Sequence, residues 1–434
     1  MIAAILLAAS AAAPPNVVLI VSDDQAWTDY GFMGHPAIET PHLDRLASQS
    51  VCFPRGYVPD SLCRPSLVSI VTGLYPHQHG VVGNDPPVPE GMWNGKGPKP
   101  YGKPRYVAVR NEYLGHIDRL DTMADLLGAA GYASHQSGKW WEGHFSRGGF
   151  TGGMTHGDRT RGGRHGDEGL TIGRKGMAPV FDFIDRQVAA EKPFHVYYAP
   201  FLPHSPHNPP ERLLAKYRRK NRPETIAKYY AMCEWFDETC GQLLNKLDEA
   251  GVADNTVVLY VCDNGWIQRP DSPRFAGRSK RSPNEGGVRT PVMVRAPGVE
   301  ARFDATPVSS VDLLPTTLAA CGLDVPGSLP GVNLLDAEAV RSRGAVCGAI
   351  YDHDIRSMTD PVASLRHRWM VKDGWKLILP YAPRLPDEEA ELYHLALDPH
   401  EAVDLAADRP GRVEELTAAL DAWWTPRPAG VAAN

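Results

Sequence analysis

Three short, unbroken runs of apolar residues constrain the fold of this chain more than any other feature of its sequence. They occupy residues 16–22 (NVVLIVS), 194–199 (FHVYYA) and 256–262 (TVVLYVC). Such β-branched and aromatic runs are typical of strands buried on both faces of a parallel sheet. Segments with helical spacing lie between and around them, at residues 41–50, 65–72, 120–130, 177–190 and 229–250. This alternation predicts an α/β fold: a large, mostly parallel central sheet sandwiched by helices.

The last ninety residues have a different pattern. Residues 369–379 (WMVKDGWKLIL) predict a hairpin that turns at Asp373-Gly374. Residues 391–397 predict a further strand and residues 413–424 a terminal amphipathic helix. We therefore expect a large α/β domain over residues 14–345 and a smaller C-terminal α+β subdomain over residues 346–434.

The first sixteen residues, MIAAILLAASAAAPPN, are apolar and end in small side chains. This pattern is typical of a secretory signal, although no basic residue precedes the apolar stretch. We expect a signal peptide over residues 1–13 and export to the periplasm or the extracellular space. A disordered tail or a misassigned start codon is the alternative.

Composition and charge exclude several classes of protein. No later segment is long and apolar enough to predict a membrane span. The net charge of −6 does not favour nucleic acid as a partner. The seven cysteines are scattered and form no CxxC pair, which argues against a disulfide scaffold or a zinc site.

Carboxylates directly follow two of the three apolar runs. Asp23 and Asp24 come after the first run, and Asp263 with Asn264 comes after the third. In open α/β sheets, ligands bind beyond the carboxyl ends of the strands. Neighbouring carboxylates repel one another unless a cation is present, and an all-oxygen set suits Ca²⁺ or Mg²⁺ better than zinc. Ordinary turns at the strand ends are the alternative interpretation.

Basic side chains fall at the same predicted edge of the sheet. Lys139 follows another predicted strand, His204 and His207 lie in a proline-rich loop after residues 194–199, and Lys280 lies in the stretch GRSKR. A single lysine or loop histidine is more often a surface group. Gathered near a metal, however, these groups would suit an oxyanion substrate.

Taken in order, these stretches resemble the type I sulfatase family of the alkaline phosphatase superfamily. The series is NVVLIVSDDQ, CRPSLVSIVTG, GKW, PHSPH, DNG and K-x-x-x-x-EGG. The resemblance runs from residue 16 to about residue 320, and ELYHLALDPHEAVDLA resembles the C-terminal segment of the family.

The resemblance implies a sulfuric ester hydrolase that acts on a sulfated small molecule or glycan, and we expect a sulfated carbohydrate. It implies that a maturation enzyme oxidises Cys63 to formylglycine, whose hydrated aldehyde is the nucleophile. It further implies Ca²⁺, with Mg²⁺ less favoured, held by Asp23, Asp24, Asp263, Asn264 and the formylglycine at position 63. Lys139 would contact the nucleophile, and His204 and Lys280 would grip the sulfate and the leaving group.

The chain departs from the family pattern at two positions. Leu67 stands where the family has an arginine, and Trp141 stands where it often has a histidine. Arg64 is a candidate replacement for the missing guanidinium; His135, His144 and His207 are candidates for the missing imidazole. We therefore take Arg64, His207 and Trp141 as candidate substrate-binding residues.

These departures leave two other functions open. One is a phosphodiester or phosphonate monoester hydrolase that uses the same site, because sulfate and phosphate esters share tetrahedral oxyanion geometry. The other is a catalytically silent glycan-binding protein in which Cys63 stays a thiol.

Three further features bear on the substrate. Four tryptophans in or near loops could stack on sugar rings, although packing is their commoner role: Trp93, Trp140, Trp141 and Trp266. The basic loop 159–167 could meet a polyanion, or it could be a solvated loop. The polar cluster 351–354 (YDHD) matches no motif.

Overall fold

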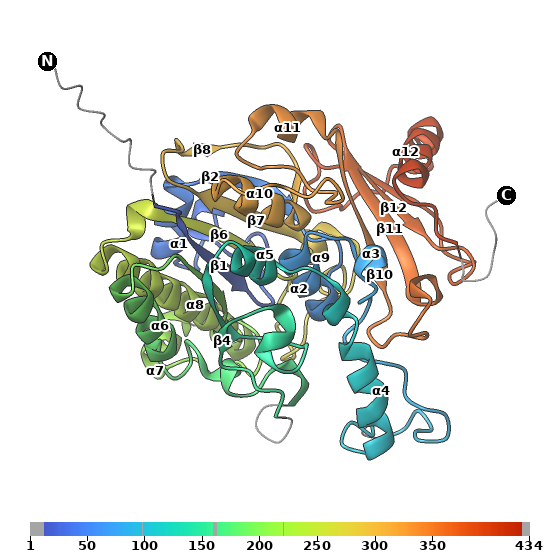
Figure 1. Ribbon diagram of the computed structural model, residues 1–434. Helices are drawn as coiled ribbons and strands as arrows, with labels where there is room; N and C mark the ends of the chain where they lie inside the picture. Colours follow the sequence, from blue (N-terminus) through green and yellow to red (C-terminus); the bar gives the residue numbers. More distant parts are fainter. Residues whose placement is uncertain (1–12, 98, 159–162, 220, 428–434) are drawn as a thin grey trace, which may run out of the picture.

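A nine-stranded mixed sheet forms the centre of the molecule (Figure 1). The computed structural model describes residues 13–97, 99–158, 163–219 and 221–427. The strand order is β4-β3-β5-β1-β6-β7-β2-β8, with β9 beside β2, and β7 is antiparallel to both of its neighbours. The strands are β1 Asn16–Ser22, β2 Val51–Tyr57, β3 Ala133–Gly138, β4 Gly152–Gly153, β5 Phe194–Ala199, β6 Thr256–Cys262, β7 Arg289–Arg295, β8 Arg302–Phe303 and β9 Val308–Ser309. The predicted mostly parallel sheet is confirmed.

Strand β1 shows why an unbroken apolar run suits this position. Val17, Leu19 and Val21 pack into the core on one face of the sheet, and Val18 and Ile20 pack into the core on the other. Both faces of a central parallel strand are covered, so neither tolerates polar side chains.

Helices cover both faces of the sheet, as predicted. Those on the first face are α2 Cys63–Thr72, α5 Met123–Ala129 and α10 Leu313–Ala320. Those on the second face are α1 Pro41–Ser48, α6 Ala178–Ala189 and α8 Glu224–Glu249. The remaining helices of the described chain are α3 Pro76–His79, α4 Pro104–Leu114, α7 Glu211–Tyr217, α9 Glu285–Val288, α11 Ala337–Ser342 and α12 Pro410–Trp423, besides several short 3₁₀ turns.

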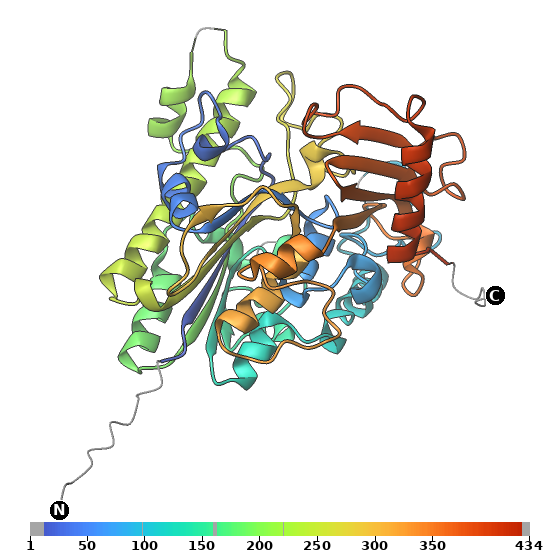
Figure 2. The same cartoon turned by 90° about the horizontal axis from the view of Figure 1, so that it is seen from above.

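A second, antiparallel sheet lies at the C-terminal end of the chain (Figure 2). Its strands are β10 Ala345–Tyr351, β11 Leu365–Lys372, β12 Trp375–Pro380 and β13 Glu391–His394. The predicted hairpin is confirmed: Lys372 pairs with Trp375 across Asp373 and Gly374. Both turn residues have positive φ, of 52° and 78°, as a two-residue hairpin requires. Helix α12 packs on one face of this sheet through Leu416 and Leu420. The division of the chain at residue 345 stays a prediction.

A buried ion cluster joins the two sheets. Lys376 Nζ, on β12, lies 2.9 Å from Glu285 Oε1 and 3.0 Å from Glu401 Oε1. All three side chains are at most 1% exposed, and the backbone N–H of Glu285 donates to Glu401. The cluster therefore ties the C-terminal sheet to the segment 277–288, which also carries Lys280.

Element boundaries differ from the prediction where local bonds decide them. Helix α5 begins at Met123 rather than residue 120, because Thr122 and Asp125 form a reciprocal capping box. The segment 148–176, predicted to be a loop throughout, contributes the short edge strand β4.

Some predictions lie outside the described residues: nearly all of the signal peptide (1–12) and residues 159–162 of the basic loop. Within the described chain, no helix combines the length and hydropathy needed to cross a membrane.

Candidate active site

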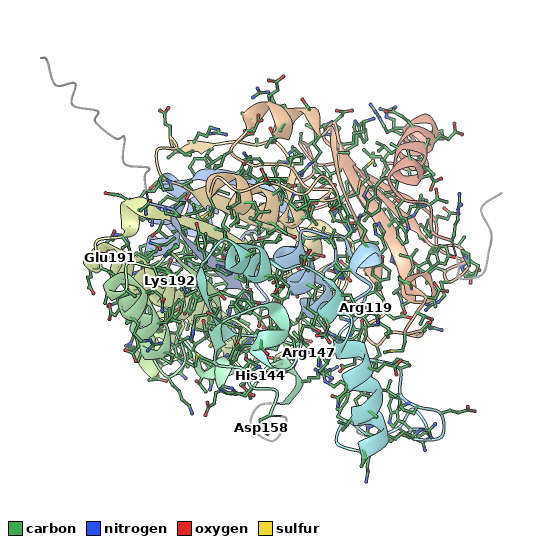
Figure 3. The ribbon with its side chains drawn as sticks, in the orientation of Figure 1. Arg119, His144, Arg147, Asp158, Glu191 and Lys192 are labelled. Carbon is green, nitrogen blue, oxygen red and sulfur yellow. The ribbon has the colours of Figure 1, made fainter. Side chains whose placement is uncertain are left out.

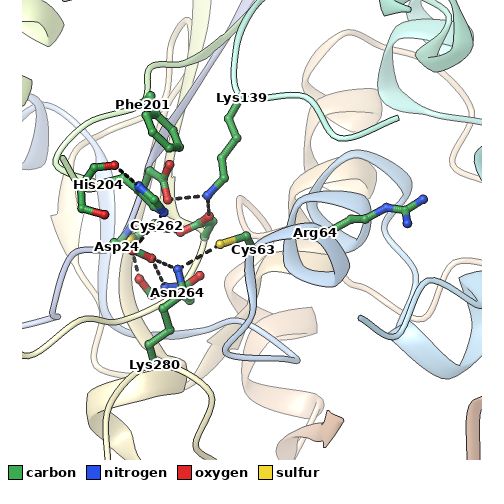
Figure 4. Close-up of polar contacts among 12 residues, drawn as sticks. Asp24, Cys63, Arg64, Lys139, Phe201, His204, Cys262, Asn264 and Lys280 are labelled. Carbon is green, nitrogen blue, oxygen red and sulfur yellow. Dashed lines mark hydrogen bonds and ion pairs between the residues drawn. The ribbon is translucent and has the colours of Figure 1, made fainter. Parts of the chain in front are cut away.

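Four neighbouring strands deliver polar side chains to one edge of the large sheet. In the order β3-β5-β1-β6, these strands are followed by Lys139, by the loop with His204, by Asp23 and Asp24, and by Asp263 and Asn264. Cys63 enters the same place from the first turn of α2, and Lys280 enters from the loop before α9 (Figure 4). The catalytic and metal-binding residues predicted from sequence thus meet at one point.

The Cys63 side chain lies at the centre of this cluster and is 2% exposed. Lys280 Nζ lies 3.0 Å from its Sγ and also contacts the Asp24 carboxylate. Burial raises the pKa of the Cys63 thiol above its ordinary value, in spite of Lys139 and Lys280 nearby. An unmodified Cys63 is therefore a protonated thiol at neutral pH and a poor nucleophile.

Three carboxylates face two ammonium groups in the cluster. Lys139 Nζ lies 2.6 Å from Asp23 Oδ1 and 3.2 Å from Asp263 Oδ2. Burial raises the pKa of Asp23, and it raises that of Asp263 to about 7. Although burial opposes it, Lys280 followed by His204 holds the pKa of Asp24 below its ordinary value. Three carboxylates against two ammonium groups leave one negative charge in excess when all five are ionised, which attracts a further cation.

Unsatisfied oxygen atoms support the same conclusion. Asp23 Oδ2, Asp24 Oδ2 and Asn264 Oδ1 are buried and accept no hydrogen bond from the described residues. Buried oxygen atoms without a donor are rare in proteins, and three hard oxygen ligands together suit Ca²⁺ or Mg²⁺. Ligand atoms of Asp23, Asp24, Cys63 and His204 also lie within 4.8 Å of one another. The residues present therefore fit a hard divalent cation.

His204 is held by the backbone beside it. Its Nδ1 lies 2.6 Å from the Ser205 carbonyl oxygen and therefore donates, which leaves Nε2 facing Asp24 Oδ2 at 3.5 Å. Burial lowers the pKa of His204 to about 3. Its neighbour His207 packs on Tyr229, with ring centroids 5.5 Å apart, and its Nε2 is buried without a hydrogen-bond partner among the described residues.

Arg64 does not reach the cluster, which corrects its assignment as a substrate-binding residue. Consecutive residues of a helix project in different directions, and Figure 4 shows Cys63 and Arg64 leaving α2 on opposite sides. Arg64 is fully buried and forms a two-point ion pair with Glu142, at 2.7 Å and 2.6 Å. Its guanidinium also lies 4.0 Å from the centre of the Tyr113 ring. In the sequence, Leu67 follows Arg64 by three residues and Trp141 directly precedes Glu142.

Removing one partner of this pair is expected to destabilise the protein strongly. Glu142→Gln leaves the buried Arg64 charge uncompensated, so we expect a loss of about 3 kcal/mol or more in the free energy of unfolding, measured by urea denaturation. The double variant Arg64→Met/Glu142→Leu should be less destabilised than the single one, because no charge remains buried.

The exposed pair Arg412–Glu415 is the matched control. Its disruption by Glu415→Gln should change the free energy of unfolding by less than about 1 kcal/mol. Equal effects at the two pairs would contradict a structural role for Arg64.

Trp141 is 1% exposed and cannot offer a ring face to a sugar, which corrects its assignment as a substrate-binding residue. Trp140 and Trp266 are also buried, whereas Trp93 is 37% exposed. Trp141 packs edge-on against His165, at 4.4 Å between ring centroids.

His165, which the sequence analysis did not single out, is the best-placed substitute for the family histidine that Trp141 replaces. Its ring centroid is 6.0 Å from that of His204, and burial followed by Lys139 lowers its pKa well below the ordinary value. Of the three candidates, His144 lies on the surface (Figure 3) and His135 packs on Phe183 of α6. His165 lies in the basic loop 159–167. No motif of fixed spacing identifies it in the sequence, and the basic composition of the loop was the one indication of a role in binding.

A cysteine lies among lysines, a histidine and buried carboxylate oxygens at the strand ends of an α/β sheet, an arrangement that fits a divalent cation together with an oxyanion. The family model for sulfatases matches residues 15–323, and the chain therefore belongs to the sulfatase family. The resemblance to that family, within the alkaline phosphatase superfamily, is confirmed.

Individual relatives agree with this assignment. N-acetylgalactosamine-6-sulfatase of the dog is 30% identical in an alignment of 366 residues that covers 73% of this chain and 65% of that relative. The crystal structure of Ps i-CgsB superposes with a TM-score of 0.71 at 22% identity and covers 95% of this chain and 93% of its own. The phosphonate monoester hydrolase of Agrobacterium radiobacter has a TM-score of 0.66 at 18% identity, over 94% and 96% of the two chains.

Proposed function

We propose that this protein hydrolyses sulfate esters of carbohydrates at a nucleophile derived from Cys63. The observation that carries the proposal is the meeting of Lys139, His204, Lys280 and the metal-binding oxygens around Cys63 Sγ. Membership of the sulfatase family supports sulfate ester hydrolysis. The name of the dog relative refers to a sulfated amino sugar, which supports a sulfated carbohydrate as substrate.

Membership of the sulfatase family supports the conversion of Cys63 to formylglycine by a maturation enzyme. Conversion would supply a hydrated aldehyde, an oxygen nucleophile that can later expel the bound sulfate. A bound Ca²⁺, held by Asp23, Asp24, Asp263 and Asn264, would supply a Lewis acid for the oxyanion. Export through a signal peptide at residues 1–13 is part of the same proposal.

The side chains around Cys63 supply positive charge and fixed hydrogen-bond donors and acceptors. Lys280 Nζ, 3.0 Å from Cys63 Sγ, can donate to an oxygen at that position or to a sulfate oxygen next to it. Asp23 and Asp263 hold the Lys139 ammonium in place and, against the effect of burial, keep its pKa well above the ordinary value. His204 directs Nε2, the ring nitrogen without a proton, toward the cluster, where it can accept a hydrogen bond from the nucleophile or the substrate. Fixed charges in a buried site stabilise a transition state without reorganisation.

A phosphonate or phosphodiester hydrolase is the second candidate, because the phosphonate monoester hydrolase has the same fold. A panel of substrates separates the two activities. We expect kcat/KM for a 6-sulfated amino sugar to exceed that for phenyl phosphonate by a factor on the order of 10³, since an enzyme selects by differential stabilisation of transition states. Initial rates of sulfate and phosphonate ester cleavage, measured on one preparation, test this. A preference for the phosphorus esters would overturn the sulfatase proposal.

A further inference from the structure

A cavity of about 570 Å³ lies beside the candidate active site. It is widely open to solvent, so it suits a charged group bound at the surface of the protein. Three separate segments line it: the loop before α4, the loop after Lys280 and the segment after β10. In Figure 1, α4 and its preceding loop project below the ends of β10 and β11. The lining residues are Lys99, Arg281, Asp352, His353, Asp354 and Arg356.

Hydrogen bonds attach the walls of this cavity to the helix that carries Cys63. The side chain of Asn84 accepts from the Arg64 backbone N–H at 2.9 Å, and its Nδ2 lies 3.3 Å from His353 Nε2. The backbone N–H of Arg281 donates to the Ser61 carbonyl at 2.9 Å. The position of the cavity relative to the nucleophile is therefore set by direct contacts at the start of α2.

Positive charge exceeds negative charge around the cavity. Three carboxylates form ion pairs with six basic side chains: Asp354 with Lys99; Asp352 with Arg356, Arg366 and Arg384; Asp85 with Arg110 and Arg164. Arg281 is a seventh basic residue. At the wall of the cavity itself, Lys99, Arg281 and Arg356 face Asp352 and Asp354, so three cations face two anions. Burial, followed by Arg281, lowers the pKa of His353 to about 3, so this histidine adds no charge of its own.

Arg281 is the basic residue that takes no part in these ion pairs. It is exposed, and among the described residues no carboxylate forms an ion pair with it. Its φ of 68° lies in the left-handed region, which costs a non-glycine residue about 1–3 kcal/mol. In this conformation, Lys280 reaches the nucleophile while Arg281 lines the adjoining cavity. Partial loss of water contact, followed by the nearby Arg366, lowers the pKa of Arg281, in keeping with an uncompensated charge.

A metal ion fits this cavity less well than an anion. Ligand atoms of Asp85, His353 and Asp354 do lie within 4.8 Å of one another. Both carboxylates, however, are already paired with Lys99, Arg110 and Arg164. A divalent cation would add to an existing excess of positive charge, whereas an oxyanion would reduce it.

We propose that this cavity binds a second negatively charged group of the substrate, with Arg281 as its main contact. The group is an oxyanion on the sulfated sugar or on the next sugar, namely a second sulfate or a uronic acid carboxylate. Trp93, on the loop before α4, has an exposed ring 5.5 Å from Lys99 Nζ and can support a sugar at the rim. This inference rests on the proposed function, because it assumes that the sulfated end of the substrate lies at Cys63.

Equilibrium binding to the full-length Cys63→Ala protein tests the proposal without turnover. The probes are N-acetylgalactosamine 6-sulfate, its 4,6-disulfate, and the 6-sulfate linked to glucuronic acid, each titrated by calorimetry in low-salt buffer with Ca²⁺. We expect at least one doubly charged probe to bind about ten-fold more tightly than the monosulfate, as for a new charge-assisted contact. The probe that gains affinity distinguishes a sulfate from a carboxylate.

The additional variant Arg281→Gln, which removes the charge but keeps a polar side chain, should reduce this advantage to less than about three-fold. Arg281→Lys should keep part of it. The control Arg212→Gln removes an exposed arginine paired with Glu238 on α7 and α8 and should keep all of it. Similar affinities for the three probes, no binding of the doubly charged ones, or an advantage that survives Arg281→Gln would overturn the proposal.

Sulfate release by the wild-type protein is measured separately. An affinity advantage without sulfate release would refute the proposed function and leave the anion cavity in place. Sulfate release without tighter binding of a doubly charged probe would refute only the proposal that the cavity binds an anion.

Discussion

Replacing Cys63 with alanine is expected to reduce kcat for sulfate ester hydrolysis by a factor on the order of 10⁴ or more, as loss of a covalent nucleophile does elsewhere. The physical reason is that the cluster is built around this side chain, with Lys280 Nζ 3.0 Å from its Sγ. The change removes one buried atom at the start of α2, so the free energy of unfolding should fall by only about 1–2 kcal/mol. Rates with a 6-sulfated amino sugar, and urea denaturation, check the two halves of this prediction.

The mass of the peptide that contains Cys63 shows which chemistry operates. After expression with a maturation enzyme, we expect it to be about 18 Da below the unmodified value, because an aldehyde replaces the thiol. An unmodified mass together with full turnover would refute the formylglycine mechanism. An unmodified mass without turnover would favour the silent glycan-binding protein.

Cys52→Ala is the matched control, because Cys52 is also buried but lies in β2 within the core on the other face of the sheet. That variant should keep its turnover. Loss of activity at both positions would show that the effect of Cys63→Ala is structural.

The second large effect is expected from Asp24→Asn. Asp24 has a φ of 63°, a left-handed conformation that asparagine tolerates as well as aspartate does, so the backbone should not change. The variant keeps the shape of the side chain but removes one of the three carboxylate charges around the cation site. We expect Ca²⁺ affinity to fall by about 100-fold or more, and kcat to fall by a factor on the order of 10³. Calorimetric titration of chelator-treated protein, followed by rate measurements, checks both.

Protection against denaturation gives a readout of the metal that does not depend on turnover. Ca²⁺ at 100 times its dissociation constant should stabilise the wild-type protein by about 2.7 kcal/mol, and the Asp24→Asn protein far less. The control is Asp118→Asn, at an exposed carboxylate paired with Arg147 at the surface (Figure 3); it should respond to Ca²⁺ as the wild type does. Unchanged Ca²⁺ binding by Asp24→Asn would show that the residues at the strand ends form ordinary turns and do not bind a metal ion.

Much of the fold could be predicted from the sequence, because it depends on local patterns. The strands at residues 194–199 and 256–262 have the predicted bounds, since β-branched and aromatic residues without breaks leave little choice of structure. The start of α5 was predicted three residues too early, although the pattern Thr122-x-x-Asp125 of its capping box is itself a local signal.

The candidate site was predicted where residues directly follow strands, and missed where they come from loops. Asp23, Asp24, Lys139 and Asp263 follow strands that are neighbours in the sheet, and therefore meet at its edge. His165 comes from a basic loop without fixed spacing, and no pattern connects it to the site.

By itself, the sequence determined the mostly parallel sheet, the family and the residues that gather around Cys63, because strand periodicity and strand-end motifs are local and ordered along the chain. Only the tertiary structure decided that Arg64 pairs with Glu142 away from the site, and that Arg281 stands beside a cavity with an excess of positive charge. The first outcome depends on a contact between residues 78 positions apart, and the second on three separate segments that meet at the cavity. Both also depend on the direction in which each side chain leaves its helix or loop. Neither can be read from the order of residues.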